Sequence, residues 1–284
     1  MKKLLIGAAM AATVSTGAQA ATVFGVDTDN FLVTFNSSAP GAFTSERLIT
    51  GTSATFLALD FRDSNGLLYG LGDDLTLYTI DTATAVASAV GGPLALSGSN
   101  FGFDFNTVVD AIRIVSNDDS NYVINADTGT ISTVATPVSY GAGDVAAGQN
   151  AIVAGNAYLH GTTTQYAIDT NLDTLVMQAN NAGTLTTVGA LGALAGPRTS
   201  FDIDFDNTAY MLDGSRFYTV DLHTGASTLV GTTSRSLYGI AIGSGAVPEP
   251  GTWALFILGF GAIGAALRRK SGQSAMGRAK LTYS

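Results

Sequence analysis

The chain has 284 residues and a formal net charge of −9, with 13 Lys and Arg against 22 Asp and Glu, and it contains no cysteine. This length suffices for one large domain or two ordinary ones. An acidic chain lacks the basic surface with which nucleic-acid-binding proteins neutralise phosphates, so we expect no nucleic-acid partner. The absence of Cys excludes disulfides, thiolate metal sites and cysteine nucleophiles.

The first 20 residues are typical of a secretory signal peptide. Two lysines are followed by an apolar run over residues 4–14, which is too short to span a bilayer, and Ala18 and Ala20 are the small residues that signal peptidase accepts. A buried N-terminal helix is the other interpretation, but the run has no polar stripe of the kind a surface helix carries. We therefore expect signal peptidase to cleave after Ala20 and the protein to be exported.

Between residues 21 and 246 the sequence predicts an all-β domain. Three segments share one strand pattern, which are residues 56–61, 101–105 and 201–205. In the last two, aromatic or apolar residues alternate strictly with Gly or Asp. Clusters of Gly, Asn and Asp follow every 8–12 residues, and helical periodicity is absent. Alternation with a period of two, interrupted by turn residues, is typical of short strands.

The strands recur in a repeat. Tyr78, Tyr122, Tyr166 and Tyr218 follow one another at steps of 44, 44 and 52 residues and mark the predicted third strands. Tyr69, Tyr158 and Tyr210 mark the predicted second strands before them. A repeat of this length with four short strands indicates a β-propeller blade. The predicted blades are residues 56–91, 101–136, 137–189 and 200–231, of which the third carries an insertion around residues 141–150.

The two ends of the repeat region complete each other. Residues 22–51 contain the second to fourth strands of a blade without a first, and residues 237–242 form a first strand with nothing after it. We therefore predict a five-bladed β-propeller that is closed by its own N- and C-terminal strands, which leaves no free sheet edge. Six blades, an open sheet and a β-sandwich are the alternatives.

These strands resemble those of an uncharacterised bacterial propeller-like family, a domain of unknown function often found in secreted proteins. The resemblance rests on Leu-Asp-Phe and Phe-Asp-Phe strands, followed by Leu-Tyr and Tyr-x-Ile-Asp, over residues 22–243. It implies the fold and export but no activity.

The C-terminal region has a different composition. The motif Val247-Pro248-Glu249-Pro250 precedes an uncharged stretch that ends at Leu267, and the basic cluster Arg268, Arg269 and Lys270 follows it. About 18 uncharged residues are just long enough for a transmembrane helix. The basic cluster would stay cytoplasmic by the positive-inside rule. A buried core helix, the alternative, fits poorly with a stretch that is apolar on all sides.

This order of elements resembles the PEP-CTERM sorting tail of Gram-negative envelope proteins. The resemblance implies transient anchoring in the inner membrane. It also implies cleavage near Pro248–Pro250 by an exosortase, a membrane transpeptidase, and release to the outer envelope or the extracellular space. The predicted organisation is a signal peptide (1–20), a propeller-like domain (21–246), a sorting signal with its helix (247–270) and a polar tail (271–284). The polar tail departs from the usual pattern, which stops soon after the basic cluster.

The predicted propeller is more acidic than the whole chain. Residues 21–247 contain 20 Asp, one Glu, six Arg and no Lys, a net charge of −15. Most Asp lie in predicted turns, where an Asp side chain bonds its own backbone. Asp202, Asp204 and Asp206 alternate along one strand, so we expect their carboxylates on one face of it.

Asp60 and Asp104 are predicted to occupy the place of Asp204 in their own blades. Since the first strand of a blade lines the central channel, these carboxylates could converge on Ca²⁺, which prefers oxygen ligands. The candidate metal ligands are Asp60, Asp104, Asp202, Asp204 and Asp206. In the alternative, each Asp accepts a backbone N–H of the neighbouring blade.

We find no catalytic residues in the sequence. His160 is expected at the surface or rim and His223 in a solvated turn, so the two histidines are isolated. No G-x-S-x-G or H-E-x-x-H motif is present, and the carboxylates are too many to single out a pair. The sequence therefore predicts an exported, non-enzymatic binding or structural propeller of the cell envelope or extracellular matrix. Exopolysaccharide is an expected partner, and Ca²⁺ is the only candidate cofactor. The alternative is a calcium-dependent hydrolase of the lactonase or glycosidase type that uses channel carboxylates.

Overall fold

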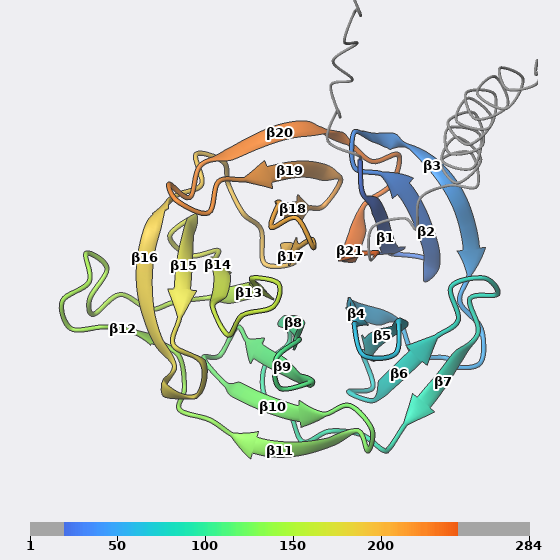
Figure 1. Ribbon diagram of the computed structural model, residues 1–284, viewed down its shortest axis with the longest axis horizontal. Coiled ribbons are helices and arrows are strands. Elements are labelled where there is room, and N and C mark those ends of the chain that lie inside the picture. The colour runs from blue at the N-terminus through green and yellow to red at the C-terminus, as the bar shows by residue number, and fades with distance from the viewer. Residues whose placement is uncertain (1–19, 244–284) are drawn as a thin grey trace, which may run out of the picture. The chain divides into compact units, whose positions relative to one another are not determined.

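A computed structural model describes residues 20–243, which form five small antiparallel sheets arranged as blades around a central axis (Figure 1). The predicted signal peptide up to residue 19, the sorting motif and the C-terminal helix lie outside the described residues. Within residues 20–243, no helix is long and apolar enough to cross a membrane. The prediction of an all-β, five-bladed propeller is confirmed.

Each blade is a four-stranded meander, with one extra strand in the fourth blade. The first blade along the chain consists of β21 (Leu237–Ile242), β1 (Thr22–Asp27), β2 (Phe31–Asn36) and β3 (Ala39–Leu48). The second consists of β4 (Phe56–Arg62), β5 (Leu67–Gly72), β6 (Leu77–Ile80) and β7 (Ala87–Val90). The third consists of β8 (Phe101–Asn106), β9 (Ala111–Ser116), β10 (Asn121–Asn125) and β11 (Thr130–Val134).

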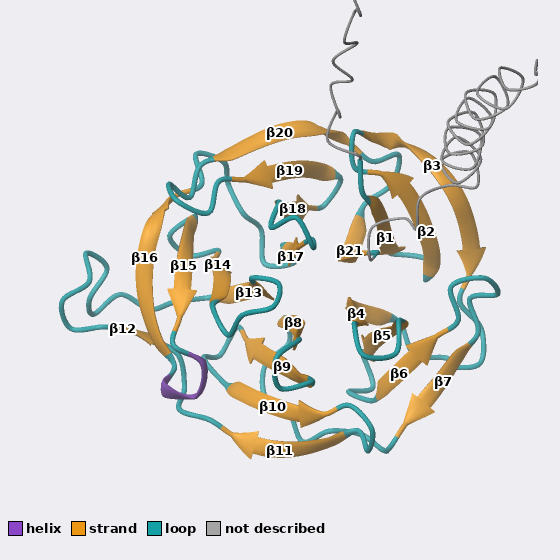
Figure 2. Ribbon diagram, in the orientation of Figure 1, coloured by secondary structure: helices purple, strands orange, loops and turns teal. Residues whose placement is uncertain are grey.

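The fourth blade consists of β13 (Val153–Tyr158), β14 (Gln165–Asp169), β15 (Thr174–Gln178) and β16 (Thr184–Ala190), with β12 (Ser139–Tyr140) added in parallel to β16. A short 3-10 helix, η1 (Asn180–Ala182), joins β15 to β16 (Figure 2). The fifth blade consists of β17 (Ser200–Ile203), β18 (Ala209–Asp213), β19 (Arg216–Val220) and β20 (Ser227–Thr232).

The first blade is closed by the two ends of the domain. Strand β21 pairs antiparallel with β1, with Val23 opposite Ile242 and Gly25 opposite Ile240. This pairing confirms the predicted closure and rules out six blades, an open sheet and a sandwich for the described residues. The closure ties residues that are more than 200 positions apart, so the ring is held without a disulfide.

Burial decreases from the axis outward. All six residues of the innermost strand β8 are buried, whereas β11 at the rim of the same blade is almost entirely exposed. The inner strands are covered on both faces by the neighbouring blades, which explains their aromatic and aliphatic composition. The outer strand β20 has no buried residue, and it combines Ser, Thr and Gly with the exposed Leu229 and Val230.

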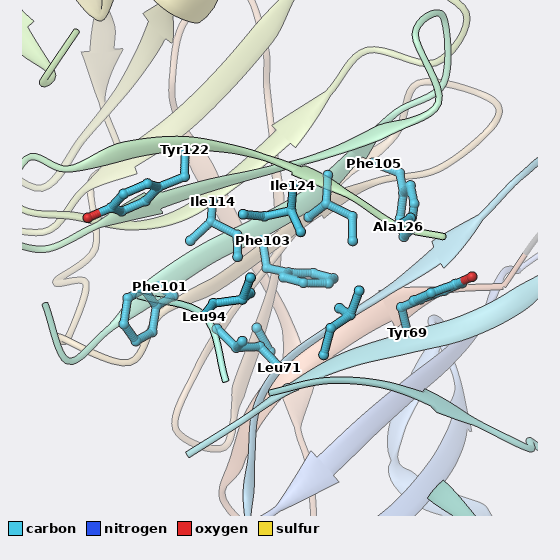
Figure 3. Close-up of a cluster of buried hydrophobic side chains, with 13 residues drawn as sticks. Tyr69, Leu71, Leu94, Phe101, Phe103, Phe105, Ile114, Tyr122, Ile124 and Ala126 are labelled. Atoms are coloured by element: carbon cyan, nitrogen blue, oxygen red, sulfur yellow. The ribbon is translucent and has the colours of Figure 1, made fainter. Parts of the chain in front are cut away.

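The hydrophobic core consists of five clusters, one between each pair of adjacent blades. Figure 3 shows the cluster between the second and third blades, where Leu71 packs near Phe103 and Ile114. Tyr69 and Phe105 meet edge to face there, with ring centroids 5.2 Å apart. The core is thus distributed around the ring and leaves the axis to polar side chains.

The outer turns follow the predicted Asp chemistry. Asp81 Oδ1 accepts the backbone N–H groups of Ala83 and Thr84 at 2.9 and 2.8 Å. Asp221 accepts those of His223 and Thr224 in the same way in the fifth blade. Gly129 in the third blade has φ +59°, and a Cβ there would lie 1.9 Å from the carbonyl oxygen of Val90. Only glycine fits where this turn approaches the second blade.

The fourth blade departs from the predicted repeat by one strand. Tyr158 and Tyr166, which the spacing aligned with second and third strands, lie on the first and second strands β13 and β14. The turn-rich insertion at residues 141–150 and strand β12 precede β13, so the extra residues shift the repeat. The blade boundaries are confirmed, but the strand assignment within this one was wrong.

Candidate functional site

Three aspartates meet on the propeller axis. Asp60, Asp104 and Asp202 lie on the innermost strands β4, β8 and β17, and each offers a carboxylate oxygen within 4.8 Å of the other two. Their side chains are buried, with at most 7% of each residue exposed. We call these three residues the channel aspartates.

The channel aspartates occupy equivalent places in their blades. Each carboxylate accepts a backbone N–H from the innermost strand of the next blade: Asp60 from Phe105 at 2.7 Å, Asp104 from Tyr158 at 2.8 Å and Asp202 from Ile242 at 2.5 Å. The residues before these three donors are Asp104, Ala157 and Ala241. The ring of five equivalent positions therefore reads Asp60, Asp104, Ala157, Asp202 and Ala241.

The two alanines leave two donors unpaired, and the aspartates next to them supply the missing acceptors. Asp60 Oδ1 accepts the N–H of Phe61 at 2.7 Å, and Asp202 Oδ1 accepts that of Ile203 at 2.6 Å. Three carboxylates thus pair five buried backbone N–H groups, using five of their six oxygens. The sixth oxygen, Asp104 Oδ1, accepts no backbone N–H from residues 20–243.

Burial next to like charge favours the protonated form of these groups. Burial, followed by the Asp202 carboxylate, raises the pKa of Asp60 well above its usual range. Burial and the charges of Asp60 and Asp202 do the same for the pKa of Asp104. Burial raises the pKa of Asp202 to about 7, although the N–H groups of Ile242 and Ile203 oppose the shift.

Two of the predicted ligands are not part of this cluster. Strand β17 ends at Ile203, and Asp204 starts a turn in which its Oδ1 accepts the N–H groups of Asp206 and Thr208 at 2.9 and 2.8 Å. Asp206 is exposed in that turn. The prediction that Asp204 matches Asp60 and Asp104 was wrong by two residues, because Asp202 holds that place. The reason is that alternation places Asp202 and Asp204 on the same face and cannot say where the strand ends.

The channel opens on a small pocket at one end. The pocket measures about 30 Å³ and is lined by the channel aspartates together with Asp63, His160, Asp204 and Phe205. His160 Nδ1 lies 3.3 Å from Asp63 Oδ2, and its ring lies 4.2 Å from that of Phe205. Sequence reasoning placed His160 at a rim but did not connect it with Asp63, since neither residue recurs in the other blades.

The arrangement can hold a cation or a shared proton but has little room for more. A volume of about 30 Å³ accommodates one or two water-sized species. Organic substrates are bound in pockets of roughly 300–1,000 Å³. Three oxygens from three strands suit a hard cation such as Ca²⁺, for which water would have to complete the coordination. The neighbouring-blade hydrogen bonds predicted as the alternative are present for all three channel aspartates.

Comparison with known families agrees with this architecture. Residues 31–241 match the model of a domain of unknown function, DUF4394. The chain belongs to this family. No curated protein matches the sequence. The DUF4394 match spans all five blades and ends in β21, the strand that closes the ring.

A second match identifies the C-terminal region. Residues 246–270 match the PEP-CTERM protein-sorting motif, which includes the predicted Val247, Pro248, Glu249 and Pro250 and the basic cluster. The chain is therefore an exosortase-sorted protein, exported through the cell envelope of a Gram-negative bacterium. The DUF4394 propeller precedes this motif in the chain.

Among solved structures, the propeller is similar to a structural-genomics protein of unknown function from Bacteroides thetaiotaomicron VPI-5482. The TM-score is 0.51 at 13% identity, and the match covers 81% of this chain and 68% of the other. A likeness at this identity shows the fold alone.

Proposed function

We propose that the mature DUF4394 domain is a non-enzymatic binding or structural module of the outer envelope or extracellular matrix. The PEP-CTERM motif directly after a closed propeller is the observation that carries this proposal. Signal peptidase would cleave after Ala20, the C-terminal helix would hold the precursor in the inner membrane, and the exosortase would release the domain. Exopolysaccharide at the cell surface is the proposed partner.

The channel supports a structural role in place of catalysis. Five of the six oxygens of the channel aspartates are engaged by backbone N–H groups. A general acid or base must reach its substrate within hydrogen-bond distance. The pocket above these carboxylates is an order of magnitude smaller than a sugar or lactone site requires. These observations argue against the hydrolase alternative.

Sorting is tested by the combined changes Pro248→Ala, Glu249→Ala and Pro250→Ala. We expect the variant to accumulate uncleaved in the membrane fraction, while the unchanged protein is recovered at the smaller size outside it. The exposed Pro93→Ala is the matched control, because it also removes a proline but lies in the propeller. Equal size and location of the triple variant and the control would refute the proposed processing.

A divalent cation in the channel is a second candidate, favoured by the convergence of three carboxylate oxygens. Asp60, Asp104 and Asp202 would be its ligands, and Asp204 would lie near them at the mouth. The test is the melting temperature in excess Ca²⁺ and in EDTA. A calcium-dependent rise that Asp104→Asn removes would support the site, and an unchanged melting temperature would exclude it. Incubation of the calcium-loaded protein with lactones and oligosaccharides would then separate turnover from binding.

A further inference from the structure

The interface between the third and fourth blades contains a buried arginine without a carboxylate partner. Arg113 on β9 is 5% exposed. Its guanidinium donates to three neutral acceptors: Tyr158 Oη at 3.2 Å, Asn121 Oδ1 at 2.8 Å and Asn181 Oδ1 at 2.7 Å. Among residues 20–243, no Asp or Glu oxygen lies within 4.0 Å of it. Buried charges are normally paired, so this one requires an explanation.

The preceding interface shows how the same fold pairs such a charge. Arg62 between the second and third blades holds both oxygens of Asp110 at 2.8 and 2.7 Å, and its Nη1 lies 2.5 Å from Asp127. At the next interface, Asn106 occupies the strand position equivalent to Arg62. The arginine of this interface, Arg113, lies instead on β9, directly opposite Asp104. The Asp104 carboxylate accepts the Tyr158 N–H and makes no ion pair with Arg113 among the described residues.

Arg113 also lines a cavity. The cavity measures about 300 Å³ between the third and fourth blades, which is the lower end of the range for small-molecule sites. Its polar lining consists of neutral groups, which are Asn106, Thr133, Tyr158, Thr163, Asn180 and Asn181. Val109 and Ala111 add apolar surface at the same place. Amides and hydroxyls around one cation suit a ligand with several hydroxyls and one negative charge.

The Arg113 guanidinium has more N–H donors than its three acceptors use. Arginine carries five N–H donors, and three are used by the acceptors named above. Asn181 is exposed, so its amide is an acceptor that a ligand oxygen can replace. A carboxylate matches the planar fork of a guanidinium in two parallel hydrogen bonds. The net charge of −15 repels polyanions, which favours a small ligand with a single charge.

We propose that this cavity, which we call the Arg113 pocket, binds the carboxylate of a small hydroxylated acid such as a single uronic acid residue. Arg113 pairs the carboxylate, and the amides of Asn106, Asn180 and Asn181 bind the hydroxyls. The proposal deepens the binding role given above and rests on it. Sorting is tested by cleavage of the precursor, whereas this pocket is tested by ligand titration. A failure of the proposed sorting can therefore be distinguished from a failure of the proposed ligand site.

The test is isothermal titration of the full chain with glucuronate, with glucose as the neutral analogue and acetate as the bare carboxylate. We expect glucuronate to bind and glucose not to bind at concentrations up to about 10 mM. Binding of acetate as tight as that of glucuronate would still support a carboxylate site but would overturn the role of the amides. Equal binding of glucose and glucuronate, or binding of neither, would overturn the proposal.

Asn181→Asp is the decisive variant. The exposed side chain keeps its shape but brings a carboxylate to Arg113, so the protein should fold, melt at or above the original temperature and lose glucuronate binding at least tenfold. The matched control is Asn65→Asp, also exposed, which adds the same charge near Arg62 at the preceding interface. Equal affinity of both variants for glucuronate would refute the site. Arg113→Met, in which an apolar side chain replaces the buried charge, should also abolish binding.

Discussion

The aspartates of the channel and those of the outer turns accept the same kind of hydrogen bond but respond to it in opposite ways. Asp81 in an exposed turn accepts two backbone N–H groups, and the Thr84 hydrogen bonds lower its pKa. Asp202 also accepts two, yet burial raises its pKa to about 7. At the axis, desolvation and neighbouring carboxylates raise the pKa more than the backbone donors lower it. At the rim, where water solvates the carboxylate, the donors determine the direction of the pKa shift.

The largest expected effect is on the pH dependence of stability. The pKa of Asp202 is about 7 in the folded state and about 3.9 when unfolded, so the folded protein binds more protons between these values. Stability should therefore fall as pH rises from about 4 to 7 and level off above 7, by up to about 4 kcal/mol for this group. Urea unfolding in EDTA between pH 4 and 8 measures the slope.

The turn aspartates act with the opposite sign. The lowered pKa values of Asp81 and Asp221 give a stabilisation that is present above about pH 4 and is lost as the pH falls below it. Together the two groups predict a stability maximum near pH 4–5. A stability that is flat or rising from pH 5 to 8 would contradict the contrast drawn between axis and rim.

Next in size is Asp202→Asn. Both carboxylate oxygens of Asp202 accept backbone N–H groups, so an amide nitrogen would face one donor and leave it unpaired in a buried place. We expect a loss of about 1–3 kcal/mol, measured by urea unfolding at about pH 4.5, where the raised pKa keeps Asp202 uncharged in the folded protein. At pH 7.5 the variant also removes the buried charge, which offsets this loss. Asp60→Asn should behave alike, since Asp60 also pairs two N–H groups. Full stability of both variants would show that these hydrogen bonds are dispensable.

Asp104→Asn is the matched comparison within the channel and should cost less than about 1 kcal/mol in the absence of calcium. Asp104 pairs one N–H, so the amide oxygen keeps that bond and the amide nitrogen takes the place of Oδ1 near the other carboxylates. The variant also removes one of three like charges, which should flatten the pH profile. A loss as large as that of Asp202→Asn would mean that the two carboxylates have the same role.

The smallest effect is expected at the rim. Asp81→Ala removes a turn acceptor whose donors can bond water instead, so the melting temperature should fall by only about 1–3 °C. The drop should shrink as the pH falls through the lowered pKa of Asp81, since the carboxylate then loses its charge. A fall as large as that of Asp202→Asn would show that exposure does not separate the two classes of aspartate.

Much of this fold could be predicted because the strands are short, alternating and repeated. The incomplete blade at each end predicted closure, and β21 pairs with β1 accordingly. The prediction failed in the fourth blade, where an insertion moved Tyr158 and Tyr166 to other strands. It also failed at the channel, where Asp204 was placed beside Asp60 and Asp104 instead of Asp202. Both errors are errors of register, which a pattern of period two does not resolve.

The sequence by itself determined the blade architecture, its closure and the sorting tail, because alternation, turn residues and a local motif are properties of neighbouring residues. Only the tertiary structure decided which aspartates meet on the axis, since that depends on where each strand ends. It alone paired five backbone N–H groups with three carboxylates. Only the structure shows that Arg113 is buried next to amide groups. The reason is that Tyr158 and Asn181, which accept its hydrogen bonds, belong to the neighbouring blade, dozens of residues away along the chain.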